Sequence, residues 1–199
     1  MNANLQFLFP TVVQVSQVPN HEALNAGIYR VVEEVRRHEP NRKPQSWACD
    51  LYTTIGSPKL LLNHPGLAEF SRLIDAQVRA YAEALNYDVE RYPPKISECW
   101  VNIYGSQHSQ EIHLHKNSLI SGIYYVKAPP GSGATLFYSP QADEMISAPI
   151  KEGNNLNATV TGFPPIEGRM LLFRSSVRHS VLPGMMEGER VTLAFNATL

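Results

Sequence analysis

Two histidines, His113 and His115, lie one residue apart in the segment QEIHLHKNS. Alternate side chains of an extended strand point to the same face, so we expect both imidazoles on one side. Neutral imidazole is a common metal ligand, and a metal site gathers several ligands from different strands. We expect the third ligand to be His179, which follows the segment GRMLLFRSS far along the chain. The alternative is a solvated histidine pair on an edge strand.

Arg190 follows His179 by eleven residues, in the segment ERVTLAFN. Strand alternation puts the apolar residues 191, 193 and 195 on a core face, with Arg190, Thr192 and Asn196 together on the other. A buried arginine is rare unless it is paired, and the strand has no acid beside it. A dicarboxylate ligand that forms a bidentate hydrogen-bonded pair with the guanidinium is therefore a natural partner. The alternative is an ordinary surface salt bridge.

The segment ECWVNIYG places Trp100, Asn102 and Tyr104 on one face of a strand. As a pocket wall, Asn102 and Tyr104 would donate hydrogen bonds to a bound anion. The alternative is a mixed core.

The sequence pattern of the elements that must position these residues changes near residue 95. Beyond it, short runs rich in Val, Ile, Tyr and Phe alternate with Gly, Pro and Asn, which predicts an antiparallel sandwich or barrel. The expected strands span 96–104, 111–115, 119–127, 134–138, 157–161, 169–174, 178–182 and 189–197. In a jelly roll the early and late strands are neighbours, which would bring the three histidines together.

Upstream, the pattern predicts an edge strand in 6–15, a helix from Asn20 as its cap to about residue 38, and an apolar-striped helix after Pro65. We therefore predict a mainly β fold with N-terminal helices, a double-stranded β-helix with the helices outside one sheet. The 199 residues suit one domain, in which 1–94 support a catalytic core in 95–199.

The composition excludes some classes of protein. The net charge is −1 and no basic run exceeds two residues, which argues against phosphate-driven nucleic-acid binding and against a polybasic membrane segment. The N-terminus has no signal-peptide pattern and no apolar run is long enough to span a bilayer, so we predict a soluble, cytoplasmic protein. Cys49 and Cys99 are expected to be separate thiols.

The order of these motifs, WVNIYG, HLHKNSLISGIYYVKAP, GATLFYSP, GRMLLFRSSVRHSVLPG and ERVTLAFN, resembles the Fe(II)/2-oxoglutarate-dependent oxygenases over residues 95–199. The resemblance implies Fe(II) as metal and 2-oxoglutarate as cosubstrate. It makes His113 the proximal and His179 the distal iron ligand. It also implies that the far carboxylate of 2-oxoglutarate is bound by Arg190, Thr192 and Tyr125, that Tyr104 touches the cosubstrate near the metal, and that Asn102 and Asn196 line the cavity.

This chain departs from the superfamily pattern at His115, where an aspartate or glutamate is usual. We expect His115 to be the third ligand, which leaves the site one charge more positive than two histidines and a carboxylate. The alternative keeps His115 off the metal and leaves a position open. Zinc or nickel could compete for three imidazoles.

The implied reaction uses O2, releases succinate and CO2, and hydroxylates a small-molecule or amino-acid-like substrate. One alternative is a three-histidine cupin-type dioxygenase or isomerase without 2-oxoglutarate, which would not need Arg190; another is a non-enzymatic β-sandwich. Specificity is expected in the loops at 40–60 and 139–168, with Trp47, Tyr52, Tyr138 and Phe163 as candidate walls. A homodimer through the N-terminal helices is a further hypothesis.

Overall fold

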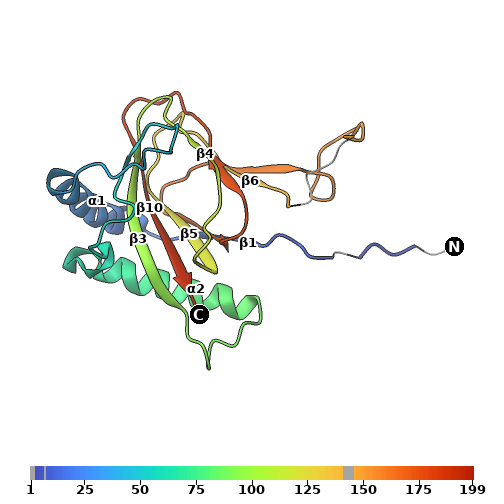
Figure 1. The fold of residues 1–199 in the computed structure, drawn as a ribbon, viewed down its shortest axis with the longest axis horizontal. Coiled ribbons are helices and arrows are strands. Elements are labelled where there is room, and N and C mark those ends of the chain that lie inside the picture. The colour runs from blue at the N-terminus through green and yellow to red at the C-terminus, as the bar shows by residue number, and fades with distance from the viewer. Residues whose placement is uncertain (1–2, 7, 141–145) are drawn as a thin grey trace.

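Two antiparallel sheets face each other in this computed structural model, which describes residues 3–6, 8–140 and 146–199 (Figure 1). The major sheet has six strands in the order β1-β8-β5-β10-β3-β2. Their bounds are Val13–Gln17, Arg169–Arg174, Ile120–Lys127, Arg190–Thr198, Lys95–Tyr104 and Tyr52–Thr53. The minor sheet has the order β4-β9-β6-β7, with bounds Gln110–His113, His179–Val181, Thr135–Tyr138 and Val160–Phe163.

Strand β10 lies at the centre of the major sheet, between β5 and β3. Every residue of it except the last is buried, as expected of a strand covered on both faces. Its register pairs Arg190 with Tyr104, Thr192 with Asn102 and Asn196 with Glu98. Directly opposed residues share a face of the sheet, so these polar side chains all point between the two sheets.

The helices α1 (His21–His38) and α2 (Ala68–Ala84) pack on the outer face of the major sheet (Figure 1). In α2 the residues Phe70, Ile74 and Val78 recur every fourth position and are fully buried, each contributing about 1.5–3 kcal/mol by burial. Phe70 contacts Tyr124 of β5 at a ring distance of 5.1 Å. This apolar layer backs the sheet and leaves its inner face free for a site.

Polar anchors and short elements complete the helical layer. Asn25 of α1 donates to the Val126 carbonyl (2.8 Å) and accepts from the Tyr124 hydroxyl (2.7 Å). Two short 3₁₀ turns, Leu61–Asn63 and Pro65–Leu67, lead into α2. Among the described residues, no helix is both long enough and apolar enough to cross a membrane.

The predicted jelly roll with helices outside one sheet is confirmed, and each strand expected after residue 95 has a counterpart. Two local predictions were correct only in part. The first strand begins at Val13 rather than near residue 6. Asn20 precedes α1 in a left-handed conformation (φ 50°) with no side-chain cap, so it serves as a turn residue. Cys49 and Cys99 are separate, buried thiols as expected.

Candidate metal centre

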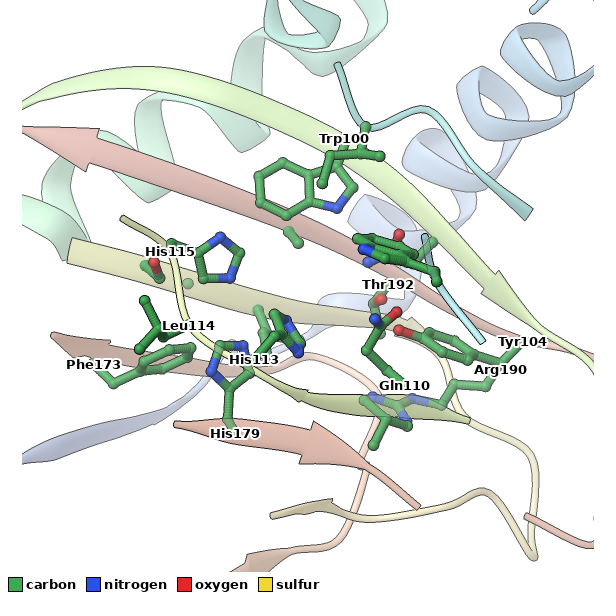
Figure 2. Close-up of a pocket in the computed structure, with 18 residues that line it drawn as sticks. Trp100, Tyr104, Gln110, His113, Leu114, His115, Phe173, His179, Arg190 and Thr192 are labelled. Carbon is green, nitrogen blue, oxygen red and sulfur yellow. The ribbon is translucent and has the colours of Figure 1, made fainter. Parts of the chain in front are cut away.

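The three predicted histidines meet between the two sheets. His113 ends β4 and His179 begins β9, and the two are direct cross-strand partners. His115 lies just beyond β4, where its backbone N–H donates to the Ser175 carbonyl (2.9 Å). One nitrogen from each ring lies within 4.8 Å of the others, and Figure 2 shows the rings gathered at one end of a cavity. The arrangement could hold a metal ion through imidazole nitrogens.

Backbone carbonyls fix the orientation of two of these rings. The Nδ1 atom of His113 lies 2.8 Å from the Glu111 carbonyl oxygen, and Nδ1 of His179 lies 3.0 Å from that of Val177. A carbonyl only accepts, so each Nδ1 carries the proton and donates it. The Nε2 lone pairs of both residues are therefore available to a metal, which is the usual outer-shell arrangement for ligating histidine.

Burial keeps all three histidines neutral near pH 7. Desolvation lowers the pKa of His113 below its ordinary value. The pKa of His115 falls to about 4 through burial and the neighbouring His113. The pKa of His179 falls to about 3, again through burial first and His113 second. A neutral imidazole is the form that binds a metal.

Arg190 occupies the other end of the cavity, and it is 1% exposed (Figure 2). Its Nη1 donates to the Gly133 carbonyl (3.0 Å) and its Nη2 to the Thr135 hydroxyl (3.3 Å). The guanidinium also lies between two aromatic rings, 4.9 Å from the centre of Tyr104 and 5.1 Å from that of Tyr125. Its Nε–H has no hydrogen-bond partner among the residues that the structure describes.

No described carboxylate forms an ion pair with this buried guanidinium. Taking a charge out of water is costly unless an opposite charge compensates it. The site is thus built around a cation that the described part of the chain does not neutralise. An anionic ligand would supply the missing partner.

The cavity between the two ends has a volume of about 180 Å³. All three histidines and Arg190 line it, and none of the described residues in its wall is acidic. Trp47 and Ile55 reach it from the segment before the 3₁₀ turns, whereas the described residues of 139–168 do not. A divalent metal here would add two positive charges to that of Arg190 in a wall without carboxylates.

The other predicted site residues divide into two groups. Thr192, Asn102 and Tyr104 line the cavity. Tyr125 lies behind Arg190, with its hydroxyl 2.8 Å from Thr135 Oγ1, and does not line the cavity. Asn196 lies behind His115 and takes part in a network of side-chain hydrogen bonds described below.

Asn102 uses its amide within the protein. With its nitrogen turned to donate to Thr53 Oγ1 (2.7 Å), its oxygen accepts from Trp100 Nε1 (3.2 Å). This contact holds the indole beside His115, at a ring distance of 5.7 Å. Tyr104 has a pKa raised to about 12, chiefly by burial, so its hydroxyl stays protonated and can donate.

Sequence reasoning missed Gly133 and Thr135, the two groups that hold Arg190. Both lie at the start of β6 or just before it, and nothing in the pattern of that segment relates them to an arginine more than fifty residues away. Gly133 is required by close approach, because a Cβ there would lie 1.8 Å from the Leu182 carbonyl oxygen. That glycine was the available signal, since a loop glycine often marks close backbone contact.

The site extends over the region that matches a known family. Residues 98–196, which include all three histidines and Arg190, match a sequence model of the family described as "Putative 2OG-Fe(II) oxygenase". These residues belong to that family. The predicted relationship to 2-oxoglutarate-dependent oxygenases is confirmed, and the expectation of an enzyme that uses iron and 2-oxoglutarate agrees with this family and with the three-histidine cluster.

Solved structures of oxygenases share the fold across almost the whole chain. A prolyl 4-hydroxylase from Pseudomonas putida is 13% identical, with 95% of this chain and 94% of that chain covered and a TM-score of 0.62. HygX from Streptomyces hygroscopicus, solved with nickel and 2-oxoglutarate bound, is 15% identical, with 94% and 83% covered and a TM-score of 0.61. A third structure is a prolyl hydroxylase from Trichoplax adhaerens in complex with a peptide fragment of hypoxia inducible factor.

 

For this Trichoplax enzyme, which is 16% identical, 92% of this chain and 83% of that chain are covered and the TM-score is 0.60. At identities this low the three likenesses establish the fold alone. A search of curated proteins found no match.

Proposed function

We propose that the chain is an Fe(II)- and 2-oxoglutarate-dependent oxygenase that hydroxylates a small-molecule or amino-acid-like substrate and releases succinate and CO2. One observation supports this above all. A cluster of three neutral histidines and a buried, unneutralised arginine lie at opposite ends of one cavity whose described wall has no acid.

The donor set fits a divalent metal. His113 and His179 present Nε2 lone pairs because their Nδ1 protons are held by backbone carbonyls. Imidazole ligands suit iron, and they suit nickel and zinc as well. We propose that the three histidines hold Fe(II), with His113 and His179 as its firmest ligands.

The other end fits the far carboxylate of 2-oxoglutarate. Arg190 has an unused Nε–H and no described acidic partner, and Thr192 lines the cavity beside it. Its position between Tyr104 and Tyr125 restricts the guanidinium, so little freedom is lost when a carboxylate binds. We propose that Arg190 and Thr192 bind this carboxylate and that Tyr104 donates a hydrogen bond to the cosubstrate. Tyr125 would act indirectly, through its contacts with Arg190 and Thr135.

When bound, the iron and 2-oxoglutarate would activate O2 for attack on a C–H bond. The chain itself provides orientation and a dry surrounding for this chemistry. Trp100, held by Asn102, lines the cavity with its ring 5.7 Å from that of His115, and the ring of Phe173 lies 4.7 Å from that of His179. These rings exclude water from the side of the cavity where the metal would lie.

The size of the cavity bears on the substrate. Its volume of about 180 Å³ is below the roughly 300–1,000 Å³ of typical ligand pockets, so the cosubstrate would fill most of it. A prime substrate would then enter only in part, on the side of the more exposed lining residues Trp47 and Leu114. Among proteins of similar fold, HygX was solved with hygromycin B bound and the Trichoplax enzyme with a peptide, so the fold can bind molecules of both kinds.

The test is spectroscopic and anaerobic. Fe(II) and then 2-oxoglutarate are added to the metal-free protein, and we expect the weak visible charge-transfer band of the chelate. Pyruvate, a 2-oxo acid without the far carboxylate, should need a much higher concentration to give a band. Arg190→Ala should bring the two acids closer together in affinity.

Each other outcome has a clear meaning. Iron binding without a band at any 2-oxoglutarate concentration would favour a three-histidine enzyme that does not use this cosubstrate. Absence of metal binding would contradict the proposed function. A band with no succinate formed from any candidate substrate would leave the cosubstrate assignment intact and would contradict only the substrate class.

A further inference from the structure

The three histidines differ in what their second ring nitrogen contacts. His113 and His179 face backbone carbonyls, which accept, whereas Nδ1 of His115 lies 3.3 Å from the amide nitrogen of Asn196, which donates. A neutral imidazole carries one proton, so a ring that accepts at Nδ1 carries its proton at Nε2. His115 would then present an N–H, and not a lone pair, through Nε2.

The orientation of the Asn196 amide is fixed by its other partners. Its nitrogen also donates to Glu98 Oε2 (2.8 Å), and a carboxylate can only accept. Its oxygen accepts from the Ser121 hydroxyl (2.8 Å), which in turn lies 2.8 Å from that of Ser175. Turning the amide round would place its oxygen against the Glu98 carboxylate, so the network disfavours that state.

The sheet geometry places these groups together. Asn196 is the cross-strand partner of both Glu98 and Ser121, so one row of side chains crosses the sheet behind His115. The ladder between β10 and β3 is irregular directly after Asn196, and such bulges re-aim side chains. Asn196 is 4% exposed and Ser121 is 2% exposed, so water competes little for the amide.

We propose that the Glu98–Asn196 pair holds His115 in its Nε2–H tautomer, so that His115 is the labile member of the histidine cluster. Ligation through its Nε2 requires the proton to move to Nδ1 and the Asn196 amide to turn away from Glu98. Asn196 and Glu98 are therefore positioning residues that weaken the third metal bond. This inference rests on the proposed metal site, although its first test does not require a metal.

The first test reads the tautomers directly. Two-bond ¹H–¹⁵N correlation spectra of the metal-free protein distinguish a protonated Nδ1 from a protonated Nε2. We expect Nδ1–H for His113 and His179 and Nε2–H for His115. An Nδ1–H tautomer of His115 in the wild-type protein would overturn the inference, whether or not the protein binds a metal.

The second test measures Co(II) affinity from its visible absorption in wild type, Glu98→Gln and the control Glu111→Gln. Glu98 is exposed and its glutamine replacement can donate to or accept from Asn196, so either amide orientation becomes satisfied. We expect Glu98→Gln to bind Co(II) about tenfold more tightly, because one charge-assisted hydrogen bond no longer opposes ligation. Glu111→Gln removes a carboxylate near His113 without touching Asn196, and should bind Co(II) no more tightly than wild type.

The sign of the effect separates this proposal from simple electrostatics. Removing a negative charge near a cation site should weaken binding by Coulomb attraction alone. Unchanged or weaker binding by Glu98→Gln would therefore overturn the role of the pair, even if His115 showed the expected tautomer. A wild-type protein that binds no Co(II) would instead contradict the proposed function, while the tautomer measurement would still stand.

Discussion

The two ends of the cavity are built in different ways. At the metal end, His113 and His179 are direct cross-strand partners, and each ring is oriented by a carbonyl two residues away in its own chain segment. At the anion end, Arg190 of β10 is held by groups from three other strands or their connections. These groups are Tyr104 of β3, Tyr125 of β5, and Gly133 and Thr135 around β6.

The metal end therefore depends on local geometry, whereas the anion end depends on the packing of the two sheets against each other. A histidine and its orienting carbonyl stay together wherever the strand is placed. The environment of Arg190 exists only when both sheets are packed, because Thr135 belongs to the minor sheet and Arg190 to the major one. The two ends should therefore respond separately to substitution.

The largest expected effect is at the metal end, with His179→Ala. Loss of a ligand whose lone pair is already oriented should weaken metal binding by more than about 100-fold, since even outer-shell partners contribute about 10- to 100-fold. Equilibrium dialysis with Fe(II) under anaerobic conditions measures this. His108→Ala is the matched control, because His108 lies outside the cluster and its Nδ1 accepts from the Gly105 N–H (3.0 Å). Equal loss in both variants would contradict the assignment.

This asymmetry also explains how much could be predicted from the sequence. The strands after residue 95 were predictable because alternation and turn residues mark them, and the HLH segment showed two imidazoles on one side. The inward position of Arg190 followed from the same alternation. Gly133 and Thr135 could not be linked to Arg190 from the sequence, because the contact between β6 and the arginine depends on the packing of the two sheets.

The Glu98–Asn196 pair was unpredictable for a similar reason. The two residues are brought together by the register between β3 and β10, next to an irregularity in the pairing of these strands. No local sequence pattern predicts that irregularity. Asn20 occupies the cap position of α1 but forms no side-chain cap hydrogen bond, because its backbone adopts the left-handed conformation of a turn. Sequence propensity indicates which residue can cap a helix. The backbone conformation leading into the helix decides whether the side chain forms that cap.

Arg190→Lys should act on the anion end alone. Lysine keeps the charge but cannot form the bidentate hydrogen bonds of the guanidinium or its planar contact with Tyr104 and Tyr125. We expect 2-oxoglutarate to bind about 10- to 100-fold more weakly, the range for charged hydrogen bonds of about 1.5–3 kcal/mol. Metal affinity should stay within about threefold of wild type. A titration of the anaerobic chelate band measures the first, and dialysis measures the second. Parallel loss of both would show that the ends are coupled.

Acid should destabilise the metal-free protein through the metal end. The folded-state pKa values of His115 and His179 are depressed to about 4 and about 3, below the ordinary value of 6.5. Below pH 6.5 the unfolded chain therefore binds more protons than the folded one, and stability falls as the pH drops. Between pH 6.5 and 4.5 we expect a loss of about 2 kcal/mol from each histidine, or roughly 4 kcal/mol in all, measured by urea unfolding. The variant His179→Gln should show a shallower slope, and an unchanged slope would contradict this cause.

The smallest effect is expected from Thr135→Val, which removes one hydroxyl from the anion end. Arg190 Nη2 and the Tyr125 hydroxyl both contact Thr135 Oγ1, at 3.3 and 2.8 Å, so the guanidinium loses one of its fixed contacts. A hydrogen bond of about 1 kcal/mol corresponds to roughly fivefold weaker 2-oxoglutarate binding. Thr135→Ser keeps the hydroxyl and should bind like wild type, with metal affinity unchanged in both variants. If valine and serine weakened 2-oxoglutarate binding equally, the methyl group rather than the hydroxyl would be what positions Arg190.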